Sequence, residues 1–232
     1  METCSQVEVH SFLIPRYMKM PGFKKPNYFL GIKITNPALL ENVDKIQKQI
    51  IAENTGASAF LEPPSKSHIT LAVMNLSPDE VEACGSLIAE KFKPGFTVKQ
   101  RTIQFRGIGN FGSRVLFSKP DEECEGFDTL HKIREQLQNI LLEADYGVTE
   151  VQKEYHPHLT MFKVRGHGKG RRKKRDSGDN SPKNLKDCDV DDLEQFYFGE
   201  EVIDKIQLLS MDKPKDEDGY YYCEKSFPLN GE

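Results

Sequence analysis

Apolar residues alternate with polar or small residues between positions 28 and 34, and this pattern predicts a β-strand. The alternation puts Phe29 and Lys33 on the face opposite the apolar one. A helix is expected next, because Asn36 can cap it, Pro37 suits its first turn, and apolar residues then recur at helical spacing. The folded part of the chain therefore begins with a strand and an amphipathic helix.

The same order of elements recurs in the second half of the chain. A strand that begins at His68 follows the first helix, and a strand that begins at His158 follows an amphipathic helix at about 122–145. The order of strand, helix and His strand thus occurs twice and indicates a structural duplication. The further predicted elements are a helix opened by the capping box Ser77-Pro78-Asp79-Glu80, strands at 98–106 and 113–118, and a hairpin of two apolar runs at 203–211 and 220–227.

Both His strands carry one short motif, His68-Ile69-Thr70-Leu71 in the first and His158-Leu159-Thr160-Met161 in the second. In a strand the His and the Thr share one face, while the aliphatic residues, continued by Val73 in the first strand, point to the other. A His can accept or donate a proton near neutral pH, and a Thr hydroxyl can donate to a phosphate oxygen. Two such strands placed together predict phosphate ester chemistry. The alternative is that both His are half-buried structural residues.

Further polar and aromatic residues fall on the open faces of the predicted strands. The candidates for substrate contact are Phe29, Lys33, Gln104, Arg106 and His156. A metal site is a competing interpretation, because His156 and His158 share a strand face with Glu154. No third ligand stands at a recognised spacing, such as H-E-x-x-H or a Cys pair, so neither a metal nor a cofactor is expected.

The glycines Gly107, Gly109 and Gly112 match the spacing of a dinucleotide-binding fingerprint. That fingerprint needs a helix to begin within the last glycines, whereas residues 114–117 predict a strand. The glycines are therefore expected to form a tight or bulged connection between two strands.

Charge is unevenly distributed along the chain. The net charge of -4 gives no general attraction to nucleic acid, but eight of the thirteen residues from 163 to 175 are basic. They overlap a biased segment at about 166–187 that is expected to be a solvated loop. A nuclear localisation signal at 171–175 and an electrostatic funnel for nucleic acid are the alternatives.

Cysteine content and hydropathy indicate a cytoplasmic or nuclear protein. The five cysteines are odd in number and include no C-x-x-C pair, which is typical of reduced thiols. No run approaches the roughly 18 apolar residues of a membrane span, so no membrane association is expected. The expected organisation is an N-terminal arm at 1–25, one domain at 26–228 and a short tail at 229–232, and a monomer is expected.

The two motifs, each on a strand of a duplicated strand-helix unit, resemble the two-histidine (2H) phosphoesterase superfamily. Within it, several segments are similar to the central domain of the A-kinase anchoring protein 7/18 group. These segments are Pro26-Asn27-Tyr28-Phe29-Leu30, Ser67-His68-Ile69-Thr70-Leu71, Gly107 to Gly112, His156-Pro157-His158-Leu159-Thr160 and Asp218-Gly219-Tyr220-Tyr221. The resemblance covers roughly residues 26 to 228.

The resemblance implies a bilobal α+β fold with duplicated strand-helix-strand units around a central groove. It also implies metal-independent chemistry, with His68 and His158 as the acid-base pair and Thr70 and Thr160 binding phosphate. That group binds adenosine monophosphate and cleaves 2′,5′-linked oligoadenylates. We therefore expect a phosphodiesterase acting on 2′,5′-oligoadenylate or a similar short RNA.

Two alternatives to this activity remain open: a non-catalytic adenosine monophosphate-binding sensor or scaffold, and an enzyme that processes cyclic phosphates at RNA ends. Binding of a kinase regulatory subunit is not expected, because no amphipathic anchoring helix follows Phe227 before the sequence ends at Glu232.

Overall fold

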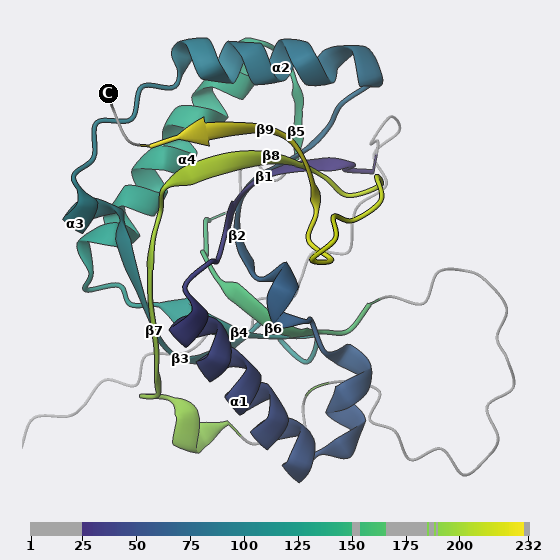
Figure 1. The fold of residues 1–232 in the computed structure, drawn as a ribbon, viewed down its shortest axis with the longest axis vertical. Coiled ribbons are helices and arrows are strands. Elements are labelled where there is room, and N and C mark those ends of the chain that lie inside the picture. Colours follow the sequence, from purple (N-terminus) through teal and green to yellow (C-terminus); the bar gives the residue numbers. More distant parts are fainter. Residues whose placement is uncertain (1–24, 150–153, 166–184, 186–187, 189, 230–232) are drawn as a thin grey trace, which may run out of the picture.

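The computed structural model describes residues 25–149, 154–165, 185, 188 and 190–229. These residues form two antiparallel sheets that lie one above the other along the longest axis of the molecule (Figure 1). The expected N-terminal arm, the charged loop and the C-terminal tail fall almost entirely outside the described residues.

The nine strands of the described residues divide unequally between the two sheets. The five-stranded sheet, in the order β5-β2-β1-β8-β9, consists of β5 (Gly147–Thr149), β2 (His68–Asn75), β1 (Tyr28–Lys33), β8 (Lys205–Ser210) and β9 (Tyr222–Pro228). The four-stranded sheet, in the order β6-β4-β3-β7, consists of β6 (Leu159–Lys163), β4 (Val115–Pro120), β3 (Thr102–Asn110) and β7 (Tyr197–Val202). The predicted C-terminal hairpin is confirmed as β8 and β9, which complete the first sheet.

Helices cover both sheets. They are α1 (Pro37–Glu53), α2 (Pro78–Lys91), the single turn α3 (Val98–Arg101) and α4 (Glu125–Glu143), with 3-10 turns at Thr55–Phe60, Pro64–Lys66 and Asp191–Leu193. The predicted helical turn at 37 is confirmed: the Asn36 side chain accepts a hydrogen bond from the Ala38 amide at 3.0 Å.

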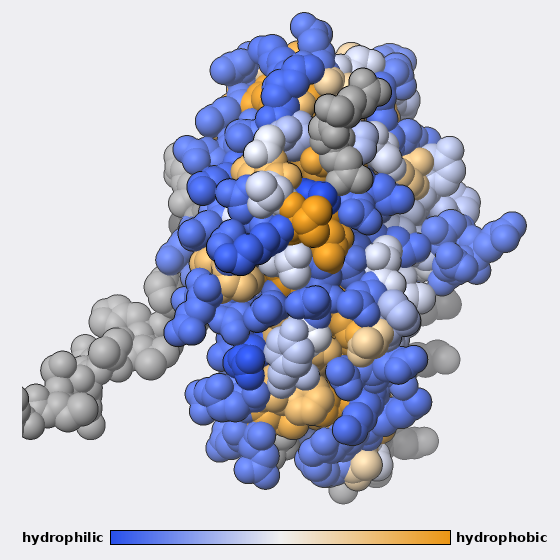
Figure 2. All heavy atoms as spheres, turned by 60° about the vertical axis from the view of Figure 1, so that its left-hand side comes forward, coloured by the Kyte–Doolittle hydropathy of each residue, from blue (hydrophilic) through white to orange (hydrophobic). Residues whose placement is uncertain are grey.

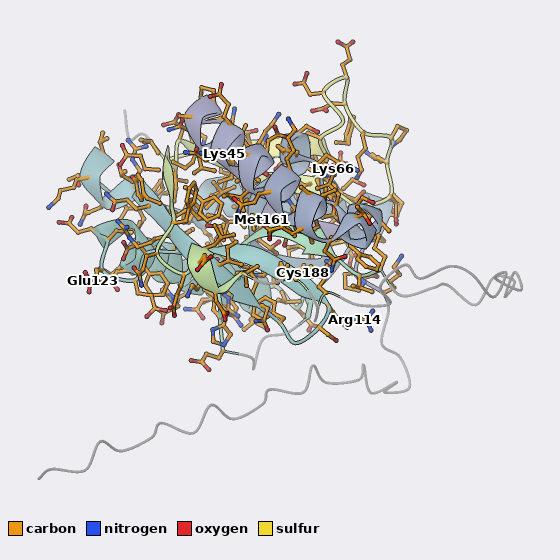
Figure 3. All side chains as sticks on the ribbon, turned by 90° about the horizontal axis from the view of Figure 1, so that it is seen from below. Lys45, Lys66, Arg114, Glu123, Met161 and Cys188 are labelled. Atoms are coloured by element: carbon orange, nitrogen blue, oxygen red, sulfur yellow. The ribbon has the colours of Figure 1, made fainter. Side chains whose placement is uncertain are left out.

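Each strand-helix-strand unit places its helix against the other sheet. The helix α1 connects β1 to β2 of the five-stranded sheet but packs on β7 of the four-stranded sheet. The helix α4 follows β4 of the four-stranded sheet and packs on β2 and β5 of the other sheet as well as on β3 of its own (Figure 1). Figure 3 shows Met161 of β6 beneath α1, where the Gln47 amide donates to the Met161 carbonyl at 2.9 Å. The bilobal α+β fold with a duplicated unit is confirmed, and both halves of the chain contribute to each lobe.

One predicted strand boundary and the predicted face of one strand residue differ from the structure. Residues 98–101 form a helical turn, because Thr97 and Gln100 cap it reciprocally, and the strand begins at Thr102. In β2, a register shift opposite Leu30 and Gly31 places Val73 beside Phe29 rather than on the face of Ile69. This bulge reverses the alternation that the sequence predicts for the end of the strand.

Only part of the glycine-rich segment connects two strands: Gly112 lies between β3 and β4, whereas Gly107 and Gly109 lie within β3. Gly107 and Gly112 have φ angles of +73° and +59°, and the β3–β4 pairing shifts register between Phe105 and Ile108. A Cβ atom on Gly107 would lie 2.2 Å from the Glu194 carbonyl oxygen. Glycine is therefore required at position 107 by both backbone conformation and space.

One large apolar cluster fills the space between the sheets and helices and includes residues of both lobes. A second, smaller cluster of Phe29, Leu209 and Tyr220 lies elsewhere on the five-stranded sheet. The face in Figure 2 is largely hydrophilic, with apolar residues in small separate groups. Within the described part of the chain, no helix has the length and apolar character needed to cross a membrane.

Glu201 of β7 joins the two lobes. The residue is 4% exposed, and its carboxylate accepts hydrogen bonds from the Thr35 amide, the Thr35 hydroxyl and the Asn36 amide at 2.7 to 2.8 Å. Replacing Glu201 with Ala removes the charged acceptor of these three part-buried hydrogen bonds, so we expect a loss of about 2 kcal/mol of unfolding free energy.

Chemical denaturation measures this effect, and Glu200→Ala is the matched control because the neighbouring side chain is exposed. Equal stability of the two variants would contradict the role given to the Glu201 carboxylate.

Candidate active site

His68 is the first residue of β2 and follows the 3-10 turn Pro64–Lys66. Its Nδ1 lies 2.7 Å from the carbonyl oxygen of Lys66. A carbonyl can only accept a hydrogen bond, so Nδ1 carries the proton and donates it. In the neutral ring, Nε2 is then unprotonated and is the nitrogen that can take a proton from a substrate.

His158 is held in the same way immediately before β6. Its Nδ1 lies 2.8 Å from the carbonyl oxygen of His156, two residues earlier. The same reasoning places the proton on Nδ1, so Nε2 is the unprotonated nitrogen of the neutral ring. In both motifs, the backbone carbonyl two residues before the His therefore fixes the imidazole in one tautomer.

Two aromatic rings contact each imidazole. The His68 ring lies 5.0 Å from the Phe29 ring and 5.4 Å from the Tyr221 ring, measured between centroids. The His158 ring lies 4.8 Å from the Phe111 ring and 5.2 Å from the Phe117 ring. These contacts restrict the rotation of each imidazole about its side-chain bonds.

A glycine in each sheet makes room for one of these rings. A Cβ atom on Gly31 would lie 2.9 Å from Cε2 of Phe29, and one on Gly109 would lie 2.6 Å from Cε2 of Phe117. The rings of Phe29 and Phe117 therefore lie over glycines and reach their His neighbours. The duplication extends beyond the His and Thr residues to the way each His is supported.

Thr70 and Thr160 are half-buried and stand two residues after the His residues. Thr70 pairs with Gly31 across β1 and β2, and Thr160 pairs with Phe117 across β4 and β6. Within the described residues neither hydroxyl has a hydrogen-bond partner. Each hydroxyl can therefore donate to an oxygen of a ligand.

Contacts between the lobes bring the two motifs together. The Tyr155 hydroxyl, at the entry to the second motif, donates to the Thr70 carbonyl oxygen at 3.1 Å. The Glu62 amide, ahead of the first motif, donates to the Met161 carbonyl oxygen at 2.9 Å. His158 also lies close enough to influence the ionisation of His68. The two motifs therefore face one site.

The surroundings of His68 disfavour its charged form. Burial lowers the pKa of its imidazole from 6.5 to about 4, and the charges of His158 and Lys163 act in the same direction. The hydrogen bond to the Lys66 carbonyl and the charge of Glu62 oppose this shift. His68 is consequently neutral at neutral pH and has an unprotonated Nε2.

Two further predicted contact residues lie beside His68. Lys33 pairs with His68 across β1 and β2, and its ammonium lies 4.5 Å from the Tyr220 ring centroid and 4.0 Å from an Asp218 oxygen. Phe29 is 2% exposed, so its ring supports His68 and offers little surface to a base.

The remaining predicted contact residues are not all at this site. Gln104 pairs with Glu200, and Arg106 lies over the Tyr197 ring and forms an ion pair with Asp121 at 3.3 Å. Within the described residues, no hydrogen bond, ion pair or ring contact joins Gln104 or Arg106 to either motif. Both residues lie on the face of β3 that the alternation predicts. However, β4 lies between β3 and β6, the strand that follows His158.

His156 is exposed, and its Nε2 lies 3.5 Å from a Glu154 oxygen. Across the described residues, no group of three or more His, Cys, Asp or Glu side chains is arranged to hold a metal ion. The role of His156 in substrate contact and the absence of a metal requirement stay predictions.

Sequence reasoning did not assign the rings that support the imidazoles. Phe111 and Phe117 flank the β3–β4 turn, and Tyr221 precedes β9, so none is near its His in sequence. The sequence did offer two signals for these rings. One is the set of glycines at 107, 109 and 112, because glycine often marks a close approach of another group, and the other is the tyrosine pair at 220 and 221.

Comparisons with known proteins agree with this fold. The family model of the AKAP7 2′5′ RNA ligase-like domain matches residues 26–229. A-kinase anchor protein 7 isoform gamma from Homo sapiens is 32% identical over 216 residues, which are 88% of this chain and 58% of the human protein. The chain thus spans little more than half the length of that relative.

Two solved structures share the architecture. LigT of E. coli complexed with 3′-AMP superposes with a TM-score of 0.61 at 16% identity, covering 90% of this chain and 100% of LigT. LigT complexed with phosphate gives a TM-score of 0.58 at 16% identity, covering 89% of this chain and 98% of LigT. At this identity the likeness shows the fold. Together with the family match, these findings show that the chain belongs to the AKAP7 2′5′ RNA ligase-like domain family.

Proposed function

We propose that the protein is a metal-independent phosphodiesterase that cleaves 2′,5′-linked oligoadenylate or a similarly short RNA. The observation that carries this proposal is the pair of imidazoles, each with Nδ1 donating to a backbone carbonyl, which leaves Nε2 as the titrating nitrogen of each ring. Thr70 and Thr160 accompany them with hydroxyls free to donate. Proton transfer at two positions and charge stabilisation on phosphate are what phosphodiester cleavage needs.

His68 acts as the general base in this proposal. Its neutral ring accepts a proton at Nε2 from the nucleophile, while His158 must be in its imidazolium form and donates the proton on Nε2 to the departing oxygen. An anionic phosphodiester bound beside His68 favours the imidazolium that forms, because an opposite charge stabilises the protonated ring. The two Thr hydroxyls donate to the nonbridging phosphate oxygens, where negative charge grows.

A 2′,5′ linkage supplies its own nucleophile. The free 3′ hydroxyl lies next to the phosphorus; it loses its proton to His68, its oxygen bonds to phosphorus, and the bond to the 5′ oxygen breaks. The products are a 2′,3′-cyclic phosphate and a 5′ hydroxyl that carries the proton from His158. Attack by water is the alternative within the same proton-transfer scheme.

The relatives support a nucleotide ligand for this chain. LigT has been seen with 3′-AMP, with phosphate and with ATP, and the family model is described as 2′5′ RNA ligase-like. We extend nucleotide binding to this chain on the basis of its two motifs. A monomer in the cytoplasm or nucleus belongs to the same proposal.

The experiment that tests the proposal is cleavage of a 2′,5′-linked diadenylate with excess chelator. We expect turnover with chelator present, and a loss of about 10² to 10⁴ in kcat for His68→Asn and for His158→Asn. An Asn amide can still donate to the carbonyl that Nδ1 bonds, but it lacks a titrating nitrogen at the Nε2 position.

A 3′-deoxy version of the same substrate is the control for the nucleophile. Loss of its cleavage together with a cyclic phosphate product from the natural substrate identifies the 3′ hydroxyl. Turnover that needs a divalent metal, or near-normal kcat in either His variant, would contradict the proposed chemistry. Binding without any turnover would favour the nucleotide sensor instead.

The low pKa of His68 predicts a specific pH dependence of stability. The unfolded chain binds a proton at this His near pH 6.5, whereas the folded protein binds it only near pH 4, so acidification between these values favours unfolding. We expect His68 to account for a loss of at most about 3 kcal/mol in this window. Denaturation curves of the wild type and His68→Asn measure it, and an identical pH dependence of the two would refute the depressed pKa.

The ring that lies over Gly109 provides a structural test. Gly109→Ala must displace the Phe117 ring, which contacts His158, so we expect about 1 to 3 kcal/mol of destabilisation and at least about a tenfold fall in kcat. Gly95→Ala is the matched control, because a Cβ at position 95 meets nothing within 4 Å. Equal kcat in the two variants would show that His158 does not depend on this ring.

A further inference from the structure

Three basic side chains lie close together beside His68, outside the two motifs. They are Lys66 in the 3-10 turn before β2, Arg165 just after β6 and Lys215 in the connection between β8 and β9. We call these three residues the basic rim. Figures 1 and 3 show the yellow β8–β9 connection beside the turn that carries Lys66.

Lys215 has an unusual environment within this group. Its ammonium lies 3.5 Å from the centroid of the Tyr221 ring, is buried, and has no hydrogen-bond partner in the described structure. Burial lowers the pKa of the ammonium, and the charges of Lys66 and Arg165 lower it further, while Asp212 opposes them. A cation without an acceptor is costly to bury, even over an aromatic face.

The nearby carboxylates leave the basic rim with excess positive charge. Glu62 is held by Arg165, whose Nη2 lies 2.7 Å and 2.9 Å from its two oxygens. Asp212 is exposed, so solvent weakens its attraction for Lys215. An anion that lay against the ammonium of Lys215 would supply the missing acceptor and strong charge-assisted hydrogen bonds.

The basic rim is adjacent to the scissile site but separate from it. The Tyr221 ring that receives the Lys215 ammonium also contacts the His68 ring at 5.4 Å. The Lys66 carbonyl accepts the hydrogen bond from His68. In the proposed function, the His and Thr residues bind the phosphate that reacts. An anion of the same ligand at the basic rim is therefore a different group.

We propose that Lys66, Arg165 and Lys215 bind a second phosphate of the substrate, and that the protein thereby selects nucleotides carrying at least two phosphate groups over those with one. This inference rests on the proposed function for the position of the first phosphate. The substrate class that it names is a nucleotide chain, or a dinucleotide with an additional terminal phosphate.

Calorimetric binding tests this proposal without any turnover. The ligands are adenosine 5′-monophosphate, adenosine 2′,5′-bisphosphate and adenosine 3′,5′-bisphosphate. We expect the wild type to bind at least one bisphosphate about tenfold or more tightly than the monophosphate. In Lys215→Gln this ratio should fall to within about threefold of unity. Each ratio is taken within one variant, so a shared effect of the substitution cancels.

Lys213→Gln is the matched control in the same connection. The Lys213 ammonium lies 2.6 Å from a Glu224 oxygen and 4.7 Å from the Tyr222 ring centroid, away from the basic rim. The Lys213→Gln variant should therefore keep the wild-type ratio of bisphosphate to monophosphate affinity. Lys66→Gln, which retains the carbonyl that fixes His68, gives a second variant in which the ratio should fall. Equal affinities in the wild type, or a ratio that survives both basic-rim substitutions, would overturn the proposal.

Cleavage separates this inference from the proposed function. The values of kcat/KM for a 2′,5′-linked diadenylate with and without a 5′-terminal phosphate should differ in the same direction as the binding ratio. A bisphosphate preference that depends on Lys215, without cleavage of either substrate, would support the second phosphate site and reject the phosphodiesterase. Cleavage that does not depend on the added phosphate, together with no bisphosphate preference in binding, would support the phosphodiesterase and reject the second phosphate site.

Discussion

A hydrogen bond from an imidazole to the carbonyl two residues before it determines what each motif can do. The bond places a proton on Nδ1 of His68 and of His158, so Nε2 is the nitrogen of each ring that gains or loses a proton. In the other tautomer Nε2 would carry the proton, and a neutral His could not act as a base there. The aromatic rings beside each imidazole and the glycines beneath two of those rings keep the bond in place.

Exchange of helices between the two units explains why the motifs face a common site. The helix α1 crosses from its own strands to the four-stranded sheet, and α4 packs on β2 and β5 of the five-stranded sheet as well as on β3 of its own. Their apolar faces, with Glu201 as a polar link, hold the lobes together from both sides. Neither lobe is built from one half of the sequence, so the relation of His68 to His158 depends on the whole core.

The sequence predicted most of the elements and the two motifs, because period-two alternation and capping are local signals. It misplaced Val73 and the start of β3, where a bulge and a reciprocal cap alter the local pattern. It grouped Gln104 and Arg106 with the site because they alternate with apolar residues along their strand. That alternation does not reveal the order of strands in a sheet. The supporting rings Phe111 and Tyr221 and the buried Lys215 come from distant segments, so only the fold reveals them.

The tautomeric state of the two imidazoles is the most direct test of this account. Nitrogen-15 NMR of the ligand-free protein at neutral pH distinguishes a protonated from an unprotonated ring nitrogen, and Asn variants assign the two residues. The account predicts a protonated Nδ1 and an unprotonated Nε2 for His68 at pH 7. Below about pH 4 its Nε2 should gain a proton. A protonated Nε2 in neutral His68, or in neutral His158, would contradict it.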